Sequence, residues 1–546
     1  MIKKRMPVAA MALVMVMMTG CGKTPAVTEP VEDAKEYVVT DVNFDSSVEV
    51  AREDNHRVFY EIFVGSFSDS DGDGLGDLRG IINRFDYLND GDVKSGKSLG
   101  IEGIWLSPIM ESPSYHKYDV ADYLAIDDEF GTMEDLKELV KVAHERDVKV
   151  IIDFVMNHSS KENDWFKKFC TARRQEDTSS EFYDFYTCEK EPVPGRRFEK
   201  IAASDWYYEC NFSGDMPELN YDNPHVKETL LKIARFYLEE VGVDGFRFDA
   251  AKYIYYGDET KNAEFWLDFM SELKKIKPDI YTVAEVWDSD TVTDKYEPAL
   301  NCFNFTMSQT EGYIAEAAKK GDVNKYVKYV DHYVKNIEKK NSDAMIVPFI
   351  ANHDTDRAAG FLQNTGGFAK VAANLYILGP GSPFIYYGEE IGMKGSRGGA
   401  NTDANRRLAM LWGDDDTVKD PKGSDYDVKL QTNGTLNDQL LSETSLYNYY
   451  KRLIMIRRAN PEMYLGTYEP LSFADTKAGG FIGEYQGTKV CVLHNTSGSS
   501  VTLDLSKVTE DAFTTVAASI GVDGLDATIE GSKVTIPAQT SVVLRK

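Results

Sequence analysis

The sequence predicts an α/β protein: a (β/α)8 TIM barrel with a small domain inserted after its third strand and a C-terminal antiparallel β-sandwich. From about residue 56, short β-rich runs alternate with segments of helical periodicity. Eight strands alternating with helices favour a closed barrel over an open doubly wound sheet. After Asn460-Pro461 the helical pattern ends, and short alternating runs such as 489–493 and 533–536 indicate the sandwich.

Local patterns define the individual elements. Thr132 and Asp135 form a capping-box-like start to one helix, and Asn223-Pro224 begins another that we expect to stop at Gly242. A long gap between the third and fourth strands, rich in aromatic, charged and cysteine residues, predicts the inserted domain. The expected barrel strands are 58–64, 101–106, 148–154, 245–249, 280–285, 302–305, 346–350 and 383–387.

These patterns divide the chain into consecutive parts. We expect a signal peptide first, then a polar tether, the barrel with its insertion, and the C-terminal domain. The boundaries are 1–20 for the signal peptide, 21–54 for the tether, 55–158 and 221–460 for the catalytic barrel, 159–220 for inserted domain B, and 461–546 for the β-sandwich domain.

The N-terminus resembles a bacterial lipoprotein signal. A basic head, Lys3-Lys4-Arg5, precedes an apolar run at 6–18 that is too short for a stable membrane span. Small residues directly before Cys21 match a signal in which that cysteine is lipidated and becomes the mature N-terminus. We expect a protein at the bacterial cell surface that meets the membrane only through this lipid. The alternative is an ordinary cleaved signal with a chance cysteine.

Composition excludes several classes of protein. Of the 546 residues 42% are hydrophobic, which rules out wholesale disorder. With 61 basic against 89 acidic residues, the formal net charge of −28 repels phosphate backbones, so nucleic acid is not an expected partner. Cys170, Cys188 and Cys210 lie close together in the sequence, which allows one disulfide among them with the pairing left open.

Ionisable residues follow several predicted strands, at the end where a barrel carries its catalytic groups. Arg247 and Asp249 lie two residues apart, so the period-2 alternation of a strand points both toward the same side. Glu285 ends the fifth strand, and Asp354 follows the seventh. The three carboxylates should therefore converge on one pocket with the guanidinium. Two imidazoles join them, those of His158 and His353.

Such a set of groups suits glycoside hydrolysis. Cleaving an acetal needs one carboxyl group to protonate the leaving oxygen and a second to support or capture the oxocarbenium-like carbon. Arg247 would hold Asp249 ionised, as a nucleophile requires. Glu285, crowded by other anions and by Trp287, should have a raised pKa and act as the acid. A single carboxylate at a strand end is usually a cap or a salt-bridge partner, but several in one chain are hard to obtain by chance.

Four segments then carry a resemblance to a known family. They read Asp153-Phe154-Val155-Met156-Asn157-His158, Gly245-Phe246-Arg247-Phe248-Asp249-Ala250-Ala251-Lys252, Glu285, and Phe349-Ile350-Ala351-Asn352-His353-Asp354, with flanking matches at 103–108 and 381–388. Over residues 56–546 the chain resembles the α-amylase superfamily, glycoside hydrolase family 13. The resemblance implies Asp249 as nucleophile, Glu285 as acid/base and Asp354 as transition-state stabiliser of a retaining mechanism. It also implies substrate binding by His158, Arg247 and His353, with Tyr118 stacking on the sugar.

Two segments bear on specificity within that family. Met216-Pro217-Glu218-Leu219-Asn220 resembles a motif of the oligo-1,6-glucosidase, neopullulanase and intermediate amylase groups. Exo-acting oligo-1,6-glucosidases typically have an Asp where Tyr115 stands. A ring there leaves an open cleft, so we expect endo cleavage of α-1,4 linkages in starch and maltodextrins. The alternatives are a neopullulanase- or cyclodextrinase-like enzyme, an oligo-1,6-glucosidase, a glucanotransferase, or a non-catalytic glucan-capturing surface protein.

A loop after the first strand has the pattern of a cation site. Residues 69–77 place carboxylates at alternate positions around glycines, an arrangement that hard cations prefer. Related members of the resembled family carry calcium there. We predict a structural Ca²⁺ held by Asp69, Asp71, Asp73, Asp77 and the Leu75 carbonyl, with a solvated acidic turn as the alternative. A second calcium, which family members hold through an Asn matching Asn157 and a His carbonyl replaced here by Tyr253, stays open.

Overall fold

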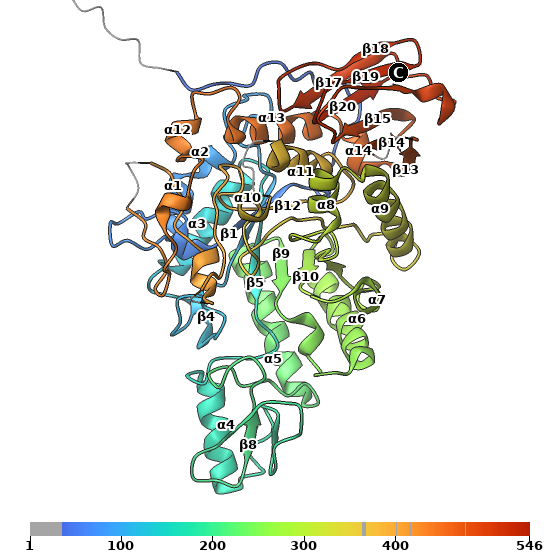
Figure 1. Cartoon of the computed structure of the whole chain (residues 1–546). Coiled ribbons are helices and arrows are strands. Elements are labelled where there is room, and N and C mark those ends of the chain that lie inside the picture. The colour runs from blue at the N-terminus through green and yellow to red at the C-terminus, as the bar shows by residue number, and fades with distance from the viewer. Residues whose placement is uncertain (1–34, 363–366, 400, 414–416, 475–476) are drawn as a thin grey trace, which may run out of the picture. The chain divides into compact units, whose positions relative to one another are not determined.

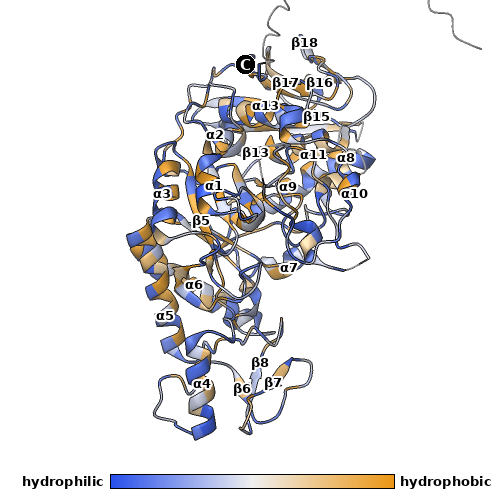
Figure 2. Cartoon of the chain, turned by 90° about the vertical axis from the view of Figure 1, so that its left-hand side faces the viewer, coloured by the Kyte–Doolittle hydropathy of each residue, from blue (hydrophilic) through white to orange (hydrophobic). Residues whose placement is uncertain are grey.

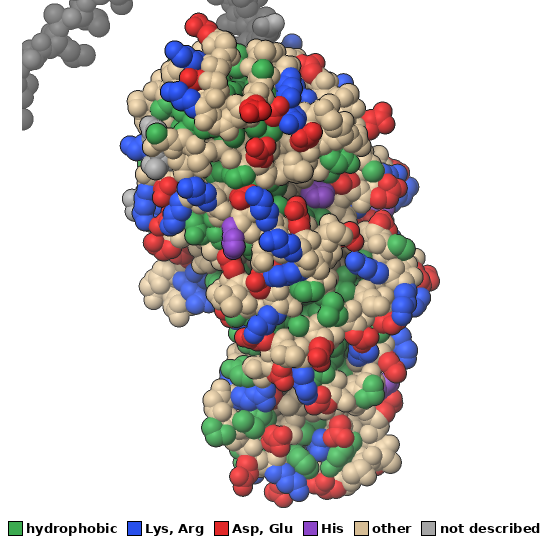
Figure 3. Space-filling view, turned by 90° about the vertical axis from the view of Figure 1, so that its right-hand side faces the viewer, with side chains coloured by type: hydrophobic (Ala, Val, Ile, Leu, Met, Phe, Trp, Pro, Cys, Tyr) green, Lys and Arg blue, Asp and Glu red, His purple; other side chains and the backbone are tan. Residues whose placement is uncertain are grey.

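The structure is a computed structural model that describes residues 35–362, 367–399, 401–413, 417–474 and 477–546. The expected signal peptide, Cys21 and most of the tether lie outside these residues. Within the described part, no helix combines the length and the apolar character that a membrane crossing requires. On the face seen in Figure 3, acidic and basic side chains are interspersed with apolar ones.

A parallel sheet forms the core of the catalytic part, as the sequence predicts. Neighbouring strands are in the order β11-β10-β9-β5-β2-β1-β12 (Figure 1). All pairs in this sheet are parallel. The strands are β1 (Phe59–Ile62), β2 (Gly103–Leu106), β5 (Lys149–Phe154), β9 (Gly245–Phe248), β10 (Tyr281–Ala284), β11 (Asn301–Cys302) and β12 (Phe384–Tyr386).

The seventh expected strand, 346–350, is not a regular strand. Only two isolated parallel bridges form there. Val347 pairs with Phe303, just after β11, and Phe349 pairs with Phe384 in β12, so this segment connects the two edges of the sheet. Pro348 lies in the middle of this run and has no N–H to donate to a ladder. The barrel is therefore closed, but its closing strand is reduced to single bridges.

The interior and exterior of the barrel follow strand alternation. Residues such as Phe59, Trp105, Tyr281 and Phe384 point inward and form one buried apolar cluster. The alternate residues of the same strands, such as Tyr60, belong to a second, larger cluster shared with the surrounding helices. Figure 2 shows hydrophobic and hydrophilic residues alternating along helices such as α5, as expected when one side of a helix covers the sheet.

The two helices whose starts the sequence predicts begin at the expected capping residues. Thr132 and Asp135 form a capping box at the start of α3, and Asn223 caps α5 with Pro224 in its first turn. A π-helical turn continues α5 to Gly242, which has the positive φ of a helix stop. The helices are α1 (Leu78–Asn83), α2 (Phe85–Leu88), α3 (Met133–His144), α4 (Asp164–Gln175), α5 (Pro224–Arg235), α6 (Glu259–Ile276), α7 (Asp290–Thr293), α8 (Tyr313–Lys320), α9 (Val323–Glu338), α10 (Ala358–Phe361), α11 (Gly367–Ile377), α12 (Leu436–Gln439), α13 (Leu446–Ala459) and α14 (Glu462–Leu465).

The segment between β5 and β9 contains its own small elements. Helix α4 is followed by a three-stranded antiparallel sheet in the order β6-β8-β7. Its strands are β6 (Cys188–Glu189), β7 (Phe198–Lys200) and β8 (Tyr207–Glu209). The disulfide that the sequence allows among Cys170, Cys188 and Cys210 does not form: the five cysteines in the described residues have free thiols. A short hairpin, β3 (Met110–Glu111) with β4 (Asp122–Ile126), precedes this segment.

The C-terminal part is the expected antiparallel β-sandwich. One sheet has the order β13-β14-β15-β20-β17 and the other β16-β19-β18. Buried side chains from both sheets, such as Leu493 and Leu544 from the first and Leu503 and Val534 from the second, form one apolar core. The strands are β13 (Thr467–Ser472), β14 (Ala478–Tyr485), β15 (Thr488–Asn495), β16 (Val501–Asp504), β17 (Thr515–Gly521), β18 (Thr528–Glu530), β19 (Lys533–Ile536) and β20 (Thr540–Arg545).

Candidate active site

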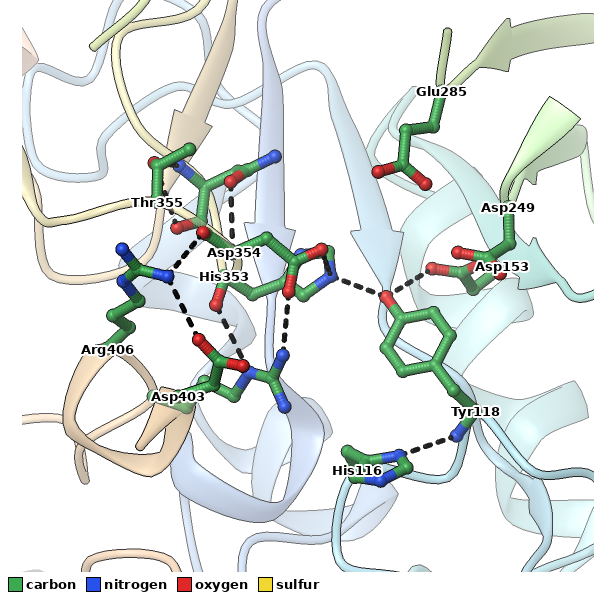
Figure 4. A network of polar contacts seen from close by, with 12 residues as sticks. His116, Tyr118, Asp153, Asp249, Glu285, His353, Asp354, Thr355, Asp403 and Arg406 are labelled. Carbon is green, nitrogen blue, oxygen red and sulfur yellow. Dashed lines mark hydrogen bonds and ion pairs between the residues drawn. The ribbon is translucent and has the colours of Figure 1, made fainter. Parts of the chain in front are cut away.

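The carboxyl ends of the barrel strands bring the predicted site residues together. Asp153 in β5 and Arg247 in β9 are partners in the strand register, and both side chains point into the barrel. Asp249 follows β9 directly, and Glu285 follows β10. Figure 4 shows the carboxyl groups of Asp153, Asp249, Glu285 and Asp354 around one space.

Arg247 is the central cation of this group. It is 1% exposed, and its Nη1 donates to Asp153 Oδ1 at 2.9 Å and to Asp249 Oδ1 at 2.6 Å. Its Nη2 donates to Glu285 Oε2 at 2.9 Å. Because both terminal nitrogens are bonded to one carbon, the carboxylates of Asp249 and Glu285 face the same small volume. One guanidinium therefore orients the two groups that the sequence assigns to nucleophile and acid.

Glu285 has the proton affinity that a general acid needs at neutral pH. Burial raises its pKa to about 7; the negative charges of Asp249 and Asp354 add to the increase, while Arg247 opposes it. The backbone N–H of Ala250 also donates to Glu285 Oε2, at 3.1 Å. The sequence predicts the raised pKa from crowding by anions and by Trp287. Burial is the larger cause, and the Trp287 ring stacks on Phe305 with centroids 4.8 Å apart.

Asp354 is held as an anion by two cations. His353 Nε2 lies 3.1 Å from its Oδ2, and Arg407 Nη2 donates to its Oδ1 at 2.7 Å. Burial raises the pKa of the Asp354 carboxyl, but the charges of His353 and Arg407 outweigh burial and hold that pKa well below its usual range. Arg407 also donates to the hydroxyl of Tyr115 at 3.1 Å, so it links Asp354 to the ring that stands at the specificity position.

Tyr118 belongs to the same network. Its hydroxyl donates to Asp153 Oδ2 at 3.0 Å and lies 2.7 Å from His353 Nε2 (Figure 4). Its ring is nearly parallel to the imidazole of His353, with an interplanar angle of 14°. The sequence predicts that this ring stacks on a sugar. The structure places it against the imidazole at the bottom of the same space.

His158 presents an unpaired nitrogen. Its Nδ1 lies 3.1 Å from Asn157 Oδ1, while its buried Nε2 has no hydrogen-bond partner. Burial lowers its pKa to about 4, so the ring is neutral at physiological pH. The amide of Asn157 also donates to the Tyr253 carbonyl at 2.5 Å. The two groups that the second calcium would share are thus bonded directly to each other.

A cavity of about 520 Å³ is connected to the site through Tyr115, which lines the cavity and accepts a hydrogen bond from Arg407. Tyr115 and Phe63 line it, and the guanidinium of Arg407 lies within 6 Å of both rings while binding Asp354. Its other lining residues come from the loop after β1, from the turn between β3 and β4, from residues 127–130 after β4, and from the segment around Pro421. Leu75 is among them, so the loop with the predicted calcium site also borders this cavity.

The loop 69–77 gathers three of its four predicted carboxylates. Ligand oxygens of Asp69, Asp71 and Asp77 lie within 4.8 Å of one another. Asp73 is not in this group, and its Oδ1 accepts the Leu75 N–H at 2.7 Å. Asp77 also caps α1 by accepting the Gly80 N–H. Three carboxylates around a glycine turn fit the oxygen preference of Ca²⁺.

Sequence reasoning missed two charged members of the site, Arg407 and Glu61. Arg407 lies in an irregular segment far from any barrel strand, and no local pattern marks it. Glu61 did leave a signal: it is the single charged residue inside the apolar strand β1, and such a residue is rarely buried without a partner. Its Oε1 lies 2.5 Å from His353 Nδ1.

Comparison with known proteins places this geometry in a family. The sequence model of the protein family described as alpha amylase, catalytic domain, matches residues 61–466. The chain is 37% identical over 445 residues to alpha-amylase 3 of Dictyoglomus thermophilum, covering 81% of this chain and 84% of that protein. It is 32% identical over 357 residues to a 4-alpha-glucanotransferase of Thermotoga maritima, covering 63% of this chain and 74% of that protein. Eubacterium rectale Amy13B, a solved structure, superimposes with a TM-score of 0.82 and 32% identity, covering 94% of this chain and 97% of its own.

The family match and the structure point to the same family. The matched region spans most of the chain and contains the strand ends that carry Arg247, Asp249, Glu285 and Asp354. The barrel of parallel strands with a C-terminal β-sandwich is also the fold of the solved relative over nearly its whole length. The chain therefore belongs to the α-amylase family, glycoside hydrolase family 13, and is an enzyme of that family that acts on α-glucans.

Proposed function

We propose that the protein is an endo-acting, retaining α-amylase that cleaves α-1,4 linkages of starch and maltodextrins. The observation that supports this most is the pair formed by Asp249 and Glu285. Arg247 binds both carboxyl groups, yet burial leaves Glu285 with a pKa of about 7. One carboxylate suited to attack therefore stands beside one carboxylic acid suited to proton donation, as a double-displacement mechanism needs.

The proposed reaction has two steps. In the first, Asp249 attacks the anomeric carbon while Glu285 gives its proton to the leaving glycosidic oxygen, so the bond to the leaving chain breaks as the glycosyl–carboxylate bond forms. In the second, the Glu285 carboxylate takes a proton from water, which attacks the same carbon and releases Asp249. Configuration at the anomeric carbon is inverted twice and so retained.

Surrounding groups would bind the sugar whose linkage is cleaved. The free Nε2 of His158 is a buried acceptor without a partner, which a sugar hydroxyl would satisfy. The Asp354 carboxylate, kept ionised by His353 and Arg407, would stabilise the positive charge that develops on the ring in the transition state. We assign Tyr118 to packing against the same sugar, since its ring lies beside His353.

Aromatic surface outside the catalytic carboxylates supports endo action. The cavity lined by Tyr115 and Phe63 offers room beyond Asp354 for further glucose units. In addition, Phe212 is 45% exposed beside His158, and Trp287 is 39% exposed two residues after Glu285. Exposed aromatic faces pack well against the apolar faces of sugars. A long chain would thus be held across the cleavage site rather than by its end.

A digest of amylose followed over time tests this proposal. An endo enzyme should produce a fast fall in iodine colour and a spread of oligosaccharides before much glucose or maltose appears. Tyr115→Ala removes the cavity wall and should lower kcat/KM on amylose by about tenfold, from the loss of one aromatic contact, while changing hydrolysis of maltotriose less. Release of single units from chain ends at constant iodine colour would contradict endo action.

The second candidate is glucanotransferase activity. It shares the first step, and a 4-alpha-glucanotransferase is among the similar proteins. Incubation with maltotriose distinguishes the two: a transferase makes longer oligosaccharides, whereas a hydrolase makes maltose and glucose. Pullulan and cyclodextrins test the neopullulanase-like and cyclodextrinase-like alternatives in the same assay. A non-catalytic glucan-capturing protein would release no reducing sugar from any of these substrates.

We also propose that the loop 69–77 binds a structural Ca²⁺. Three carboxylates gathered at one turn repel one another unless a cation lies between them. Bound ligand adds to the free energy of unfolding, by about 2.7 kcal/mol at one hundred times Kd, so chelation should lower the melting temperature by a few degrees. The matched control is Asp71→Asn, which should melt lower than wild type and no longer respond to the chelator. An unchanged melting temperature in wild type would remove the ion from the proposal.

Cell-surface anchoring is the last part of the proposal. The basic head, the apolar run and the small residues before Cys21 support lipidation at that cysteine. Cys21→Ser should abolish incorporation of radioactive palmitate and release the protein from the membrane fraction. Label that persists in the variant would contradict the assignment of Cys21.

A further inference from the structure

Glu61 is a buried acid at the carboxyl end of the barrel. Alternation along β1 points Phe59 and Glu61 inward, and the ring of Phe59 stacks on Phe384 with centroids 4.8 Å apart. Glu61, two residues further along, is 2% exposed. Its Oε1 lies 2.5 Å from Nδ1 of His353 and also accepts the His353 backbone N–H at 3.3 Å. A buried carboxylate requires such a partner, so Glu61 and His353 form one unit.

The other ring nitrogen of His353 has acceptors as well. Its Nε2 lies 3.1 Å from Asp354 Oδ2 and 2.7 Å from the Tyr118 hydroxyl. That hydroxyl donates its own proton to Asp153 and must therefore accept from the imidazole. Since an ionised carboxylate only accepts, both ring nitrogens of His353 must carry protons. The bonding pattern is that of an imidazolium ion between two carboxylates.

We propose that Glu61 is a positioning residue that keeps His353 doubly protonated, so that Nε2 always offers a proton toward Asp354 and Tyr118. This inference rests on the proposed hydrolysis of α-glucans and adds a residue to it. Without the Glu61 charge, His353 would lose its second proton as the pH rises through neutrality. If the remaining proton stayed on Nδ1, a bare Nε2 would face Asp354 and compete with Asp153 for the Tyr118 hydroxyl proton.

The charges around the ring favour the same protonation state. Burial lowers the pKa of His353, but Asp354 and Glu61 outweigh burial and raise it to about 10. Two carboxylates on opposite edges of the ring thus act together, and removing either should lower the pKa of the imidazole by about one to three units. The other ionisable groups of this site are Tyr118, Asp153, Arg247, Asp249, Glu285 and Arg407.

Nuclear magnetic resonance of the whole protein labelled with 13C at histidine Cε1 tests this directly. Comparison with His353→Gln identifies the His353 signal. In wild type that signal should keep its imidazolium shift from pH 5 to pH 8.5, and in Glu61→Gln it should titrate with a midpoint about three units lower. Glu61→Asp, which keeps the charge, should stay closer to wild type than Glu61→Gln does. A wild-type midpoint below 8 would overturn the proposal without any variant.

Activity gives the second readout. The ratio of kcat/KM between Glu61→Gln and wild type should rise by about tenfold from pH 8 to pH 5, because protonation restores the imidazolium in the variant. Dividing by wild type cancels the titration of Glu285, which both proteins share. A merely structural role would give a constant ratio, and that result would overturn the proposal. If the protein hydrolyses no glucan, the proposed function fails, while the resonance titration still decides the state of His353.

Discussion

The active site can be compared with a second group of buried carboxylates that has a different environment. Glu389 and Glu390 follow β12, and both are bound by tyrosine hydroxyls rather than by cations. Glu389 Oε1 accepts from Tyr376 at 2.5 Å and from Tyr450 at 2.8 Å. Glu390 Oε1 accepts from Tyr60 at 2.9 Å and from another tyrosine, Tyr87. We call Glu389 and Glu390 the tyrosine-bound pair.

Glu285 and Glu389 share a raised pKa, but they differ in their hydrogen-bond partners and in their exposure. Burial raises the pKa of Glu389 to about 7, the same value as for Glu285. However, Glu285 is hydrogen bonded to a guanidinium and is only partly buried, whereas Glu389 is hydrogen bonded to tyrosine hydroxyls and is buried. A raised pKa therefore does not mark a catalytic acid by itself. What distinguishes the active site is that a second carboxyl group, that of Asp249, binds the same guanidinium as Glu285 does.

The comparison predicts its largest effect at Asp249. Asp249→Asn removes the nucleophile while keeping the shape of the side chain, so kcat on soluble starch should fall by about 10⁴-fold or more. Glu389→Gln is the matched change in the tyrosine-bound pair, and its kcat should stay within about twofold, as expected for a group outside the site. Reducing-sugar release measures both. Substantial activity in Asp249→Asn would move the nucleophile elsewhere.

Glu285→Gln should have the next largest effect, and its size should depend on the leaving group. General acid catalysis contributes about 10²–10⁴-fold, so turnover of starch should fall in that range. An α-maltosyl fluoride needs little protonation and should still form the glycosyl–enzyme, which the variant hydrolyses slowly. Mass spectrometry should then find a maltosyl adduct on the peptide that contains Asp249. An equal loss on starch and on the fluoride would exclude Glu285 as the acid.

The wild-type pH profile follows from the same carboxyl group. Because Glu285 must be protonated for the first step and its pKa is about 7, kcat/KM on starch should decline as the pH rises above 7. The decline should be absent when Glu285→Gln acts on the fluoride. A wild-type profile that stays flat to pH 9 would show that the acid has a much higher pKa than burial gives Glu285.

The active-site residues that lie in or directly after barrel strands could be predicted from the sequence, because a strand and its end are recognisable from a short stretch of residues. Arg247 and Asp249 are two residues apart in a strand, so their common direction follows from alternation alone. The prediction of a regular strand at 346–350 was wrong, because Pro348 has no N–H to donate and interrupts the pairing. Arg407 was not found because its contact with Asp354 joins segments far apart in the chain, and only the folded structure shows it.

The smallest predicted effect concerns stability and again contrasts Glu389 with Glu285. A carboxyl group whose folded-state pKa is raised contributes stability that is complete below its unfolded value, about 4.3, and is lost as the pH rises through 7. Each of the two groups should therefore cost the native state on the order of 2 kcal/mol between pH 5 and pH 8. Urea unfolding of wild type, Glu389→Gln and Glu285→Gln at these two pH values measures the difference.

Both variants should lose less stability than wild type over this pH range, because a glutamine does not ionise. Their activities should diverge: Glu389→Gln should hydrolyse starch normally, and Glu285→Gln should not. Tyr376→Phe adds a further control, since removing one donor to Glu389 should raise the pKa of that carboxyl and strengthen the pH dependence. If Glu389→Gln keeps the wild-type pH dependence of stability, Glu389 is ionised in the folded protein, and the tyrosine hydroxyls stabilise the charge more than burial opposes it.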